Sequence, residues 1–251
     1  SLLVTALALA GGFAAAPARA ELEVSFSFFH ENLAPYGDWI EVNDYGYCWR
    51  PAGIDADWAP STDGYWSYTD AGWTWVSYED FGPITYHYGR WVFIEGEGWC
   101  WVPDYEWGPA WVSWRKSDDY IGWAPLPPEA SWNVSVGFGT WTDSYYDIGS
   151  RYYRFCSVGD FGAPVIRSVC RPWRDNITII AGTVNITNIS FNHRRGWVHC
   201  GGPDYGWINR HSRRHVPALK LVQNNNYTVV NNTIVNNNTT IVNNGGRDRS
   251  R

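Results

Sequence analysis

A tryptophan-rich hairpin pattern recurs along the first half of the chain and constrains its fold more than any other feature. In each copy, a strand that begins with tryptophan runs through a glycine-containing acidic turn into a second aromatic strand. The return strands carry Trp49, Trp75 and Trp101, which follow one another at intervals of 26 residues. A regular spacing of this length is typical of repeat architectures, and aromatic strands joined by Gly/Asp turns are typical of antiparallel hairpins.

The alternation of residues gives each predicted hairpin two different faces. Side chains on a strand point alternately to opposite sides of the sheet. In the third copy, Trp99 and Trp101 therefore share one face, and Cys100 and Val102 share the other. We expect one face of indole rings and one face of smaller side chains in every copy.

A second motif separates the hairpins and combines an acid, an aromatic residue, a small residue and proline. It occurs at residues 57–60, 80–83 and 106–109. Proline cannot donate a hydrogen bond to a central β-ladder, so we interpret the motif as a corner that leads the chain to the next strand. The proline-rich stretch 125–128 is expected to close the array.

The sequence thus predicts an all-β protein. Tandem antiparallel β-hairpin repeats of about 26 residues would form a compact sheet or a small barrel-like module over residues 33–130. A smaller, basic β-rich region would follow over residues 131–222, with at most one short helix. Residues 223–251 form an Asn-rich, low-complexity tail that we expect to be flexible in the monomer and capable of self-association.

Two local predictions concern the basic region. Apolar and polar residues alternate over 176–180 and 184–189 with Gly182 between them, which predicts a further hairpin. Pro203-Asp204 before Tyr205 is typical of a helix start, so the single short helix is expected there. Ala218 to Val222 is predicted as a strand.

The first 20 residues have the features of a secretory signal peptide that is truncated at its start. The stretch from Leu2 to Ala16 is apolar, and Ala18 and Ala20 form a small-residue cleavage pattern. We expect export to a bacterial periplasm or to the extracellular space. No second apolar run is long enough to span a bilayer, so no transmembrane segment is expected.

Charge is distributed unequally along the chain. Residues 21–150 contain 21 acidic and four basic residues, whereas residues 151–251 contain four acidic and fourteen basic ones. The acidic part would repel phosphates, which makes nucleic acid an unlikely partner. The two parts are expected either to dock on each other or to be solvated as separate surfaces.

Five cysteines in an exported protein favour disulfide formation. Cys156 and Cys170 flank a glycine-containing turn and are the first predicted pair. Cys48 and Cys100 would pair only if the first and third hairpins come together, which leaves Cys200 over. Cys200 with His211 and His215 lacks a fourth zinc ligand, so no metal site and no cofactor are predicted.

The sequence contains no motif that identifies catalytic residues. The tryptophans have two interpretations. As structural residues they fill a core between hairpins. As functional residues, indoles surrounded by polar groups would stack on sugar rings. The candidates for this ligand-binding role are Trp39, Trp49, Trp66, Trp75, Trp91 and Trp101.

The stretch from Leu33 to Pro128 resembles a family of exported bacterial proteins known as a domain of unknown function. The resemblance is carried by residues 36–39, 88–92, 98–103, 107–115 and 122–128. It implies export and bacterial origin and supplies no catalytic residues. We therefore expect a non-enzymatic structural or interaction module of the bacterial cell envelope, with an envelope polymer or protein as partner. The alternatives are a carbohydrate- or peptidoglycan-binding module that uses exposed tryptophans, and an uncharacterised hydrolase.

Overall fold

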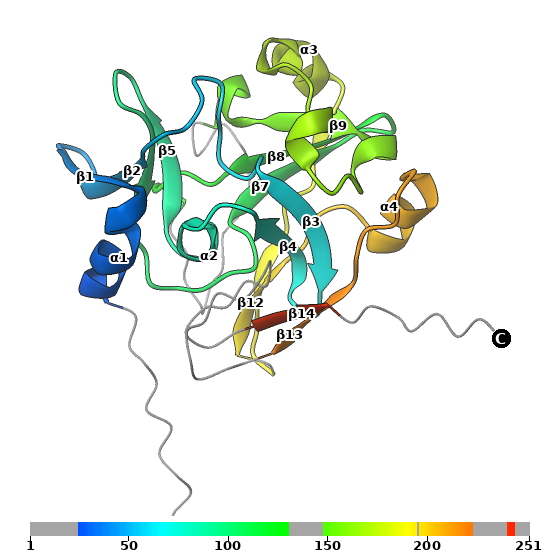
Figure 1. The fold of residues 1–251 in the computed structure, drawn as a ribbon. Coiled ribbons are helices and arrows are strands. Elements are labelled where there is room, and N and C mark those ends of the chain that lie inside the picture. Colours follow the sequence, from blue (N-terminus) through cyan, green and yellow to red (C-terminus); the bar gives the residue numbers. More distant parts are fainter. Residues whose placement is uncertain (1–24, 131–147, 195, 223–239, 244–251) are drawn as a thin grey trace, which may run out of the picture.

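The computed structural model describes residues 25–130, 148–194, 196–222 and 240–243. The predicted signal peptide and most of the Asn-rich tail lie outside these residues. The described chain is mostly β, with three four-stranded sheets, one two-stranded sheet and short helices (Figure 1). The expected fold class is confirmed at this level.

Four hairpins carry a tryptophan on each strand, and the two tryptophans of a hairpin lie directly opposite each other. The sequence predicted three of these hairpins. The fourth was missed because Trp123 follows Trp101 by fewer residues than the other return strands, and it was interpreted as the closing segment. The hairpins are β1 (Gly37–Val42) with β2 (Gly46–Pro51), β3 (Gly64–Thr69) with β4 (Gly72–Ser77), β5 (Arg90–Ile94) with β6 (Gly98–Val102), and β7 (Val112–Lys116) with β8 (Tyr120–Pro125). Their tryptophan pairs are Trp39–Trp49, Trp66–Trp75, Trp91–Trp101 and Trp114–Trp123.

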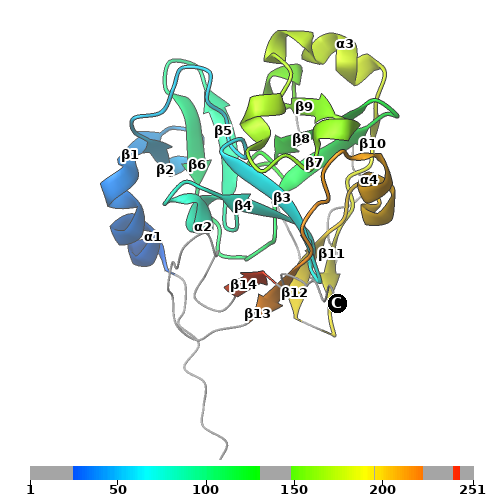
Figure 2. The same ribbon diagram turned by 45° about the vertical axis from the view of Figure 1, so that its right-hand side comes forward.

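The hairpins do not join in chain order. The first and third share one sheet with strand order β1-β2-β6-β5, joined where Trp49 faces Trp101. The second and fourth belong to two other sheets, which Figure 2 shows beside the first, towards the right of the view. The predicted single sheet or barrel-like module is therefore wrong, and the described residues contain no closed barrel. An indole-rich face must be covered by another layer, so the hairpins stack on one another instead of continuing edge to edge.

Strands of the basic region extend the hairpin sheets. The fourth hairpin is flanked by β9 (Arg154–Ser157) and β10 (Val184–Asn185). The second hairpin is joined by β12 (Trp197–Cys200), which runs parallel to β4 and pairs with β11 (Ile189–Asn192). The predicted strand near residue 220 is confirmed as β13 (Leu219–Val222), which pairs with β14 (Thr240–Asn243) of the Asn-rich tail.

The basic region contains more helix than expected. The predicted helix is confirmed as α4 (Tyr205–His211), where the Asp204 side chain accepts a hydrogen bond from the backbone N–H of Trp207 at 2.6 Å. The predicted hairpin over 176–189 is wrong in its first half, because residues 176–181 form the helix α3 (Asn176–Ala181). The limit of one short helix is wrong for the same reason. The remaining helical segments of this region are short 3-10 turns: η3 (Ser150–Tyr152), η4 (Val158–Asp160), η5 (Ile166–Val169) and η6 (Trp173–Asp175).

Tertiary contacts explain why a β-branched segment becomes α3. The Asn176 side chain donates hydrogen bonds to the carbonyls of Ser150 and Tyr153, at 2.8 and 2.7 Å. Ile179 is buried against the main core, whereas Ile177 is exposed. The hydrogen bonds at its N-terminal end and the burial of one face stabilise this short helix. Together they outweigh the modest β preference of Ile and Thr.

Two further helices belong to the hairpin part. The helix α1 (Phe26–Leu33) begins at Ser25 and continues into η1 (Ala34–Tyr36). Its buried Phe29 meets Trp101 edge to face at 5.1 Å, so α1 covers the indole face of the sheet that holds the first and third hairpins. The second corner motif forms the one-turn helix α2 (Gly82–Thr85).

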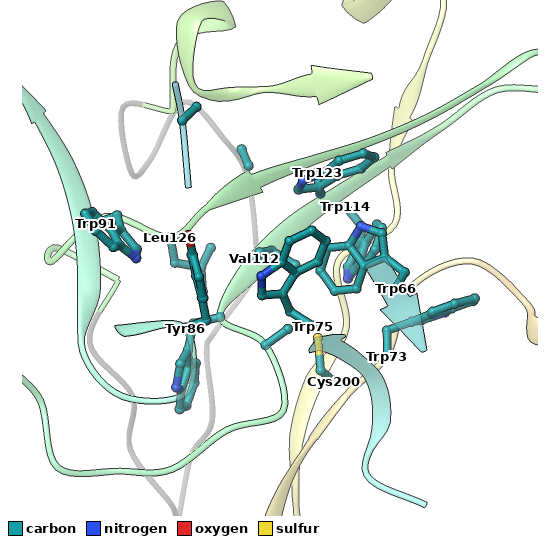
Figure 3. Packing of buried hydrophobic residues seen from close by; sticks show 14 of the residues in the cluster. Trp66, Trp73, Trp75, Tyr86, Trp91, Val112, Trp114, Trp123, Leu126 and Cys200 are labelled. Carbon is teal, nitrogen blue, oxygen red and sulfur yellow. The ribbon is translucent and has the colours of Figure 1, made fainter. Parts of the chain in front are cut away.

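Aromatic rings of the second and fourth hairpins form the centre of the core (Figure 3). The ring of Trp66 lies 5.1 Å from that of Trp75, 4.5 Å from Trp114 and 5.8 Å from Trp123. Phe161 of the basic region stacks on Trp66 at 6.5 Å. Both parts of the chain therefore contribute to one hydrophobic core.

A glycine at the start of three hairpins lies against the tryptophan of the return strand. A Cβ atom on Gly89 would lie 2.6 Å from the Trp101 ring, and one on Gly64 would lie 2.8 Å from the Trp75 ring. Gly37 meets Trp49 at the same 2.8 Å. The glycine lets the backbone pass flat over the indole, which links the Gly and Trp positions of the sequence pattern.

Candidate functional site

Most of the tryptophans predicted as ligand-binding residues lie inside the core. Trp49, Trp66, Trp75, Trp91 and Trp101 are 0–3 % exposed. Trp39 is half-buried, between Phe26 at 5.0 Å and His30 at 5.6 Å. A buried indole offers no face to a sugar ring. In this structure the rings of these five tryptophans pack against other side chains of the core. A ligand-binding role for this set stays a prediction.

A different set of aromatic and acidic residues lines a pocket of about 580 Å³, which we call the acidic pocket. Its walls come from η1, the loop between β2 and β3, the corner after β4, and one residue of η5. The carboxylates are Asp55, Asp63, Glu79 and Asp80, the rings are Tyr36, Trp58, Tyr78 and Phe81, and the single cation is Arg167. The remaining lining is formed by small or aliphatic residues.

Two corner motifs meet in the acidic pocket. Trp58 belongs to the first motif, and Asp80 with Phe81 belongs to the second. The Trp58 and Phe81 rings pack edge to face at 6.3 Å. The proline that follows each pair turns the chain away, so the aromatic and acidic side chains remain at the corner. On the sequence alone we interpret the motif only as a connection, although its acid–aromatic pair is a signal from which a site could have been predicted.

Glu79 is the most perturbed acid of the pocket. Its Oε1 accepts a hydrogen bond from Trp58 Nε1 at 2.6 Å, and its Oε2 accepts from Ser77 Oγ at 3.0 Å and from the Tyr86 hydroxyl. Burial raises the pKa of Glu79 to about 7, although these three donors act in the opposite direction. Near neutral pH the carboxyl thus exchanges between its charged and neutral forms.

The rim of the acidic pocket is polar and open to ligands. Asp80, Tyr36 and Tyr78 are exposed, and the Tyr78 hydroxyl donates to the carbonyl of Pro164 at 2.7 Å. Arg167 is held by Asp55 at 2.7 Å and by Asp57 at 3.1 Å. Four carboxylates against one paired guanidinium leave the pocket negative, so it favours neutral or amine-bearing ligands over anions.

Arg167 joins the pocket from the basic region. It lies 112 residues from Asp55 and 110 from Asp57 along the chain. This ion pair supports the expectation that the two oppositely charged parts dock on each other, although the exposed pair itself contributes little stability. Nothing in its local sequence distinguishes Arg167 from its arginine neighbours.

All five cysteines are free in the structure. Cys156 and Cys170 lie opposite each other in an isolated antiparallel β-bridge, the arrangement that a cross-strand disulfide requires. Cys48 and Cys100 lie on neighbouring strands because the first and third hairpins do come together, but the Trp49–Trp101 register makes them diagonal neighbours. Diagonal side chains lie about 7–8 Å apart, so this second pair would need a shift of the strands.

We predict that oxidised protein contains one bridge, between Cys156 and Cys170. Alkylation after unfolding without reductant should label Cys48, Cys100 and Cys200, and reduction before alkylation should add the other two. A peptide that links residues 156 and 170 in the non-reduced digest would identify the bond. Labelling of all five cysteines in protein purified from an oxidising compartment would contradict the pairing.

The histidines and cysteine considered for zinc do not gather into a ligand set. Cys200 is buried in β12, His211 stacks on Trp207 at 4.4 Å, and His215 contacts Tyr205. Within the described ranges, no three His, Cys, Asp or Glu side chains are placed to hold a metal ion together. In the same part of the chain, no helix has the length and apolar character needed to cross a membrane.

Comparison with known proteins gives one match. The sequence model of a family of unknown function (DUF6600) matches residues 30–130. No curated protein and no solved structure matches the chain. The matched residues include all four tryptophan hairpins and every residue that lines the acidic pocket except Arg167. A DUF6600 family domain therefore covers residues 30–130 of this chain.

Proposed function

We propose that this protein is an exported, non-enzymatic interaction module of the bacterial cell envelope whose acidic pocket binds a segment of envelope glycan. Export and bacterial origin rest on the signal-like first 20 residues and on the family resemblance of residues 33–128. The proposal also takes the hairpins to be copies of one unit of about 26 residues. Under this proposal the repeat tryptophans build the scaffold, and the residues that line the acidic pocket supply the ligand contacts.

The acidic pocket is the observation that supports glycan binding. Glycans are recognised by rings that cover the apolar face of a sugar and by polar groups that bind its hydroxyls. The pocket combines exposed Tyr36 and Tyr78 with several carboxylates at one corner. Its negative charge favours neutral sugars or amino sugars over acidic ones.

Replacing Tyr36 with alanine tests this proposal. We expect the wild-type protein to bind oligomers of N-acetylglucosamine or of glucosamine, and Tyr36→Ala to weaken binding about tenfold because one stacking ring is lost. Asp80→Asn should weaken binding of the charged glucosamine oligomer more than that of the N-acetylated one. Isothermal titration calorimetry on the full chain gives both affinities.

Tyr47→Ala is the matched control, because Tyr47 is a similarly exposed tyrosine that lies outside the pocket. It should leave both affinities unchanged. An equal loss of affinity in Tyr36→Ala and Tyr47→Ala would contradict the proposed ligand class. The absence of binding to any glycan or muropeptide in a panel would also contradict it.

A hydrolase is the second candidate, and the raised pKa of Glu79 is the observation that favours it. A carboxyl that is partly protonated near neutral pH suits a general acid, and glycosidases pair such a group with a second carboxylate. If the glycan panel shows cleavage by the wild-type protein, Glu79→Gln should abolish turnover while binding persists. Cleavage that survives in Glu79→Gln would exclude this residue as the acid.

A further inference from the structure

A second pocket, of about 330 Å³, lies on the basic region, and we call it the basic pocket. Four arginines line it: Arg154 of β9, Arg167 of η5, Arg171 just before η6, and Arg174 of η6. Trp173 also lines it and is 44 % exposed, and Asp57 contributes one carboxylate to the lining. Arg167 lines both pockets, so the two sites adjoin.

The arginines of the basic pocket are unequally neutralised. Arg167 is paired with Asp55 and Asp57, and Arg171 is paired with Asp175 at 3.2 Å. Arg154 and Arg174 have no carboxylate within ion-pair distance in the described part of the chain. The four arginines and these three carboxylates therefore leave one net positive charge at the pocket.

Arg154 is held in place by backbone carbonyls and makes no ion pair with the described residues. One of its terminal nitrogens donates to the carbonyls of Arg151 and Tyr153, at 3.0 and 2.8 Å. Burial lowers the pKa of Arg154, although the nearby Cys170 and Asp57 act in the opposite direction. A desolvated guanidinium is unfavourable unless an anion accompanies it, so the free site is poised for an anionic group.

Cys170 does not supply the missing negative charge. This thiol lines the basic pocket, and burial raises its pKa to about 12. It is therefore neutral at physiological pH, and it would also be neutral in a bridge with Cys156. Asp57 lines the pocket but already pairs with Arg167, so a ligand would supply the remaining counter-charge.

We propose that the basic pocket binds the carboxylate of an acidic sugar, with Trp173 as the platform for its ring. Arg174 lies over one face of the Trp173 ring at 5.2 Å, so a cation and a partly exposed indole lie together at the pocket. The planar guanidinium of Arg154 suits bidentate recognition of a carboxylate. This site is separate from the acidic pocket and does not depend on the glycan proposed for that pocket.

Titration of trigalacturonate against the full chain tests the proposal, with neutral galactotriose and inorganic phosphate as comparison ligands. We expect trigalacturonate to bind, galactotriose to bind at least tenfold more weakly, and the affinity for trigalacturonate to fall with ionic strength. Trp173→Ala and Arg174→Gln should each weaken trigalacturonate binding about tenfold. Both side chains are exposed, so circular dichroism of these variants should match that of the wild type.

Arg154→Lys and Arg194→Gln complete the set. The lysine keeps the charge but loses the fork geometry, so binding should weaken while the fold persists. Arg194 is an exposed arginine outside the pocket, and its replacement should change nothing. An equal loss of trigalacturonate affinity in Arg194→Gln would show that the binding reflects only the overall positive charge of the protein. Phosphate binding as tight as trigalacturonate and unaffected by Trp173→Ala would overturn the assignment to an acidic sugar, as would the absence of binding at low ionic strength.

Discussion

Replacing Gly89 with alanine is expected to destabilise the protein by about 2–5 kcal/mol, through backbone strain and overpacking together. Gly89 has a φ of +61°, and a Cβ there would lie 2.3 Å from the Val102 carbonyl oxygen and 2.6 Å from the Trp101 ring. The ring cannot retreat, because Trp101 is fully buried and its Nε1 donates to the Tyr88 carbonyl at 2.8 Å. Urea unfolding followed by circular dichroism measures the loss.

Alanine substitutions at two other glycines separate the contribution of backbone strain from that of the steric clash with the indole. Gly96 has a φ of +89° but open space around it, so Gly96→Ala should lose only the strain contribution, about 1 kcal/mol. Gly149 has neither a positive φ nor a neighbour within 4 Å, so Gly149→Ala should be nearly neutral. A Gly89→Ala loss no larger than that of Gly96→Ala would show that the indole contact contributes nothing.

The second large effect concerns the pH dependence of stability. Glu79 has a pKa of about 7 in the folded protein, above its ordinary value of 4.5, because burial disfavours the charged form. The folded state therefore binds a proton more readily than the unfolded chain. The resulting stabilisation, up to about 3 kcal/mol for a shift of this size, is present below pH 4.5 and is lost as the pH rises through 7.

His87 acts in the opposite sense over a similar range. Burial lowers its pKa to about 4 from 6.5, and it is held neutral with Nδ1 2.9 Å from the Gly108 carbonyl oxygen. Stability is therefore lost as the pH falls from 6.5 towards 4, since only the unfolded chain takes up the proton readily. We expect the two residues to offset each other and to leave the wild-type profile nearly level between pH 4.5 and 6.5.

Glu79→Gln should reveal the pH dependence of stability that the two residues mask in the wild-type protein. The difference in unfolding free energy, wild type minus variant, should fall by about 3 kcal/mol between pH 4.5 and 8 as the Glu79 contribution disappears. The same difference for His87→Gln should change with the opposite sign. Urea titrations at several pH values provide both differences, and a Glu79→Gln difference that is independent of pH would contradict the buried carboxyl.

Local features of the sequence predicted local structure well. Three hairpins were evident from aromatic alternation and turn glycines, and α4 was evident from Asp204 at its start. These signals are informative because the contacts that determine a hairpin or a helix start lie within a few residues of each other in the sequence. The α3 helix was mispredicted because contacts with Ser150 and Tyr153, more than 20 residues away, decide its conformation.

The arrangement of the hairpins and the site depended on distant contacts. Nothing in the repeat spacing indicates that Trp49 faces Trp101 while the second hairpin lies in another sheet. The number of tryptophans in the sequence favours a ligand-binding role as much as a structural one, and it does not reveal that five of the six candidates are buried in the core. Two corner motifs contribute Trp58, Asp80 and Phe81 to the acidic pocket, and its Arg167 comes from a part of the chain with many similar arginines.

The parallel pairing of β12 with β4 has a consequence for how the chain folds. The Trp73 indole donates to the Pro203 carbonyl, a partner 130 residues later, so the edge of β4 stays open until most of the polypeptide has been synthesised. Contacts this far apart slow folding, and open strand edges invite aggregation in the interval. The protein should therefore reach its native state only after synthesis, and a chaperone that shields this edge should raise its refolding yield.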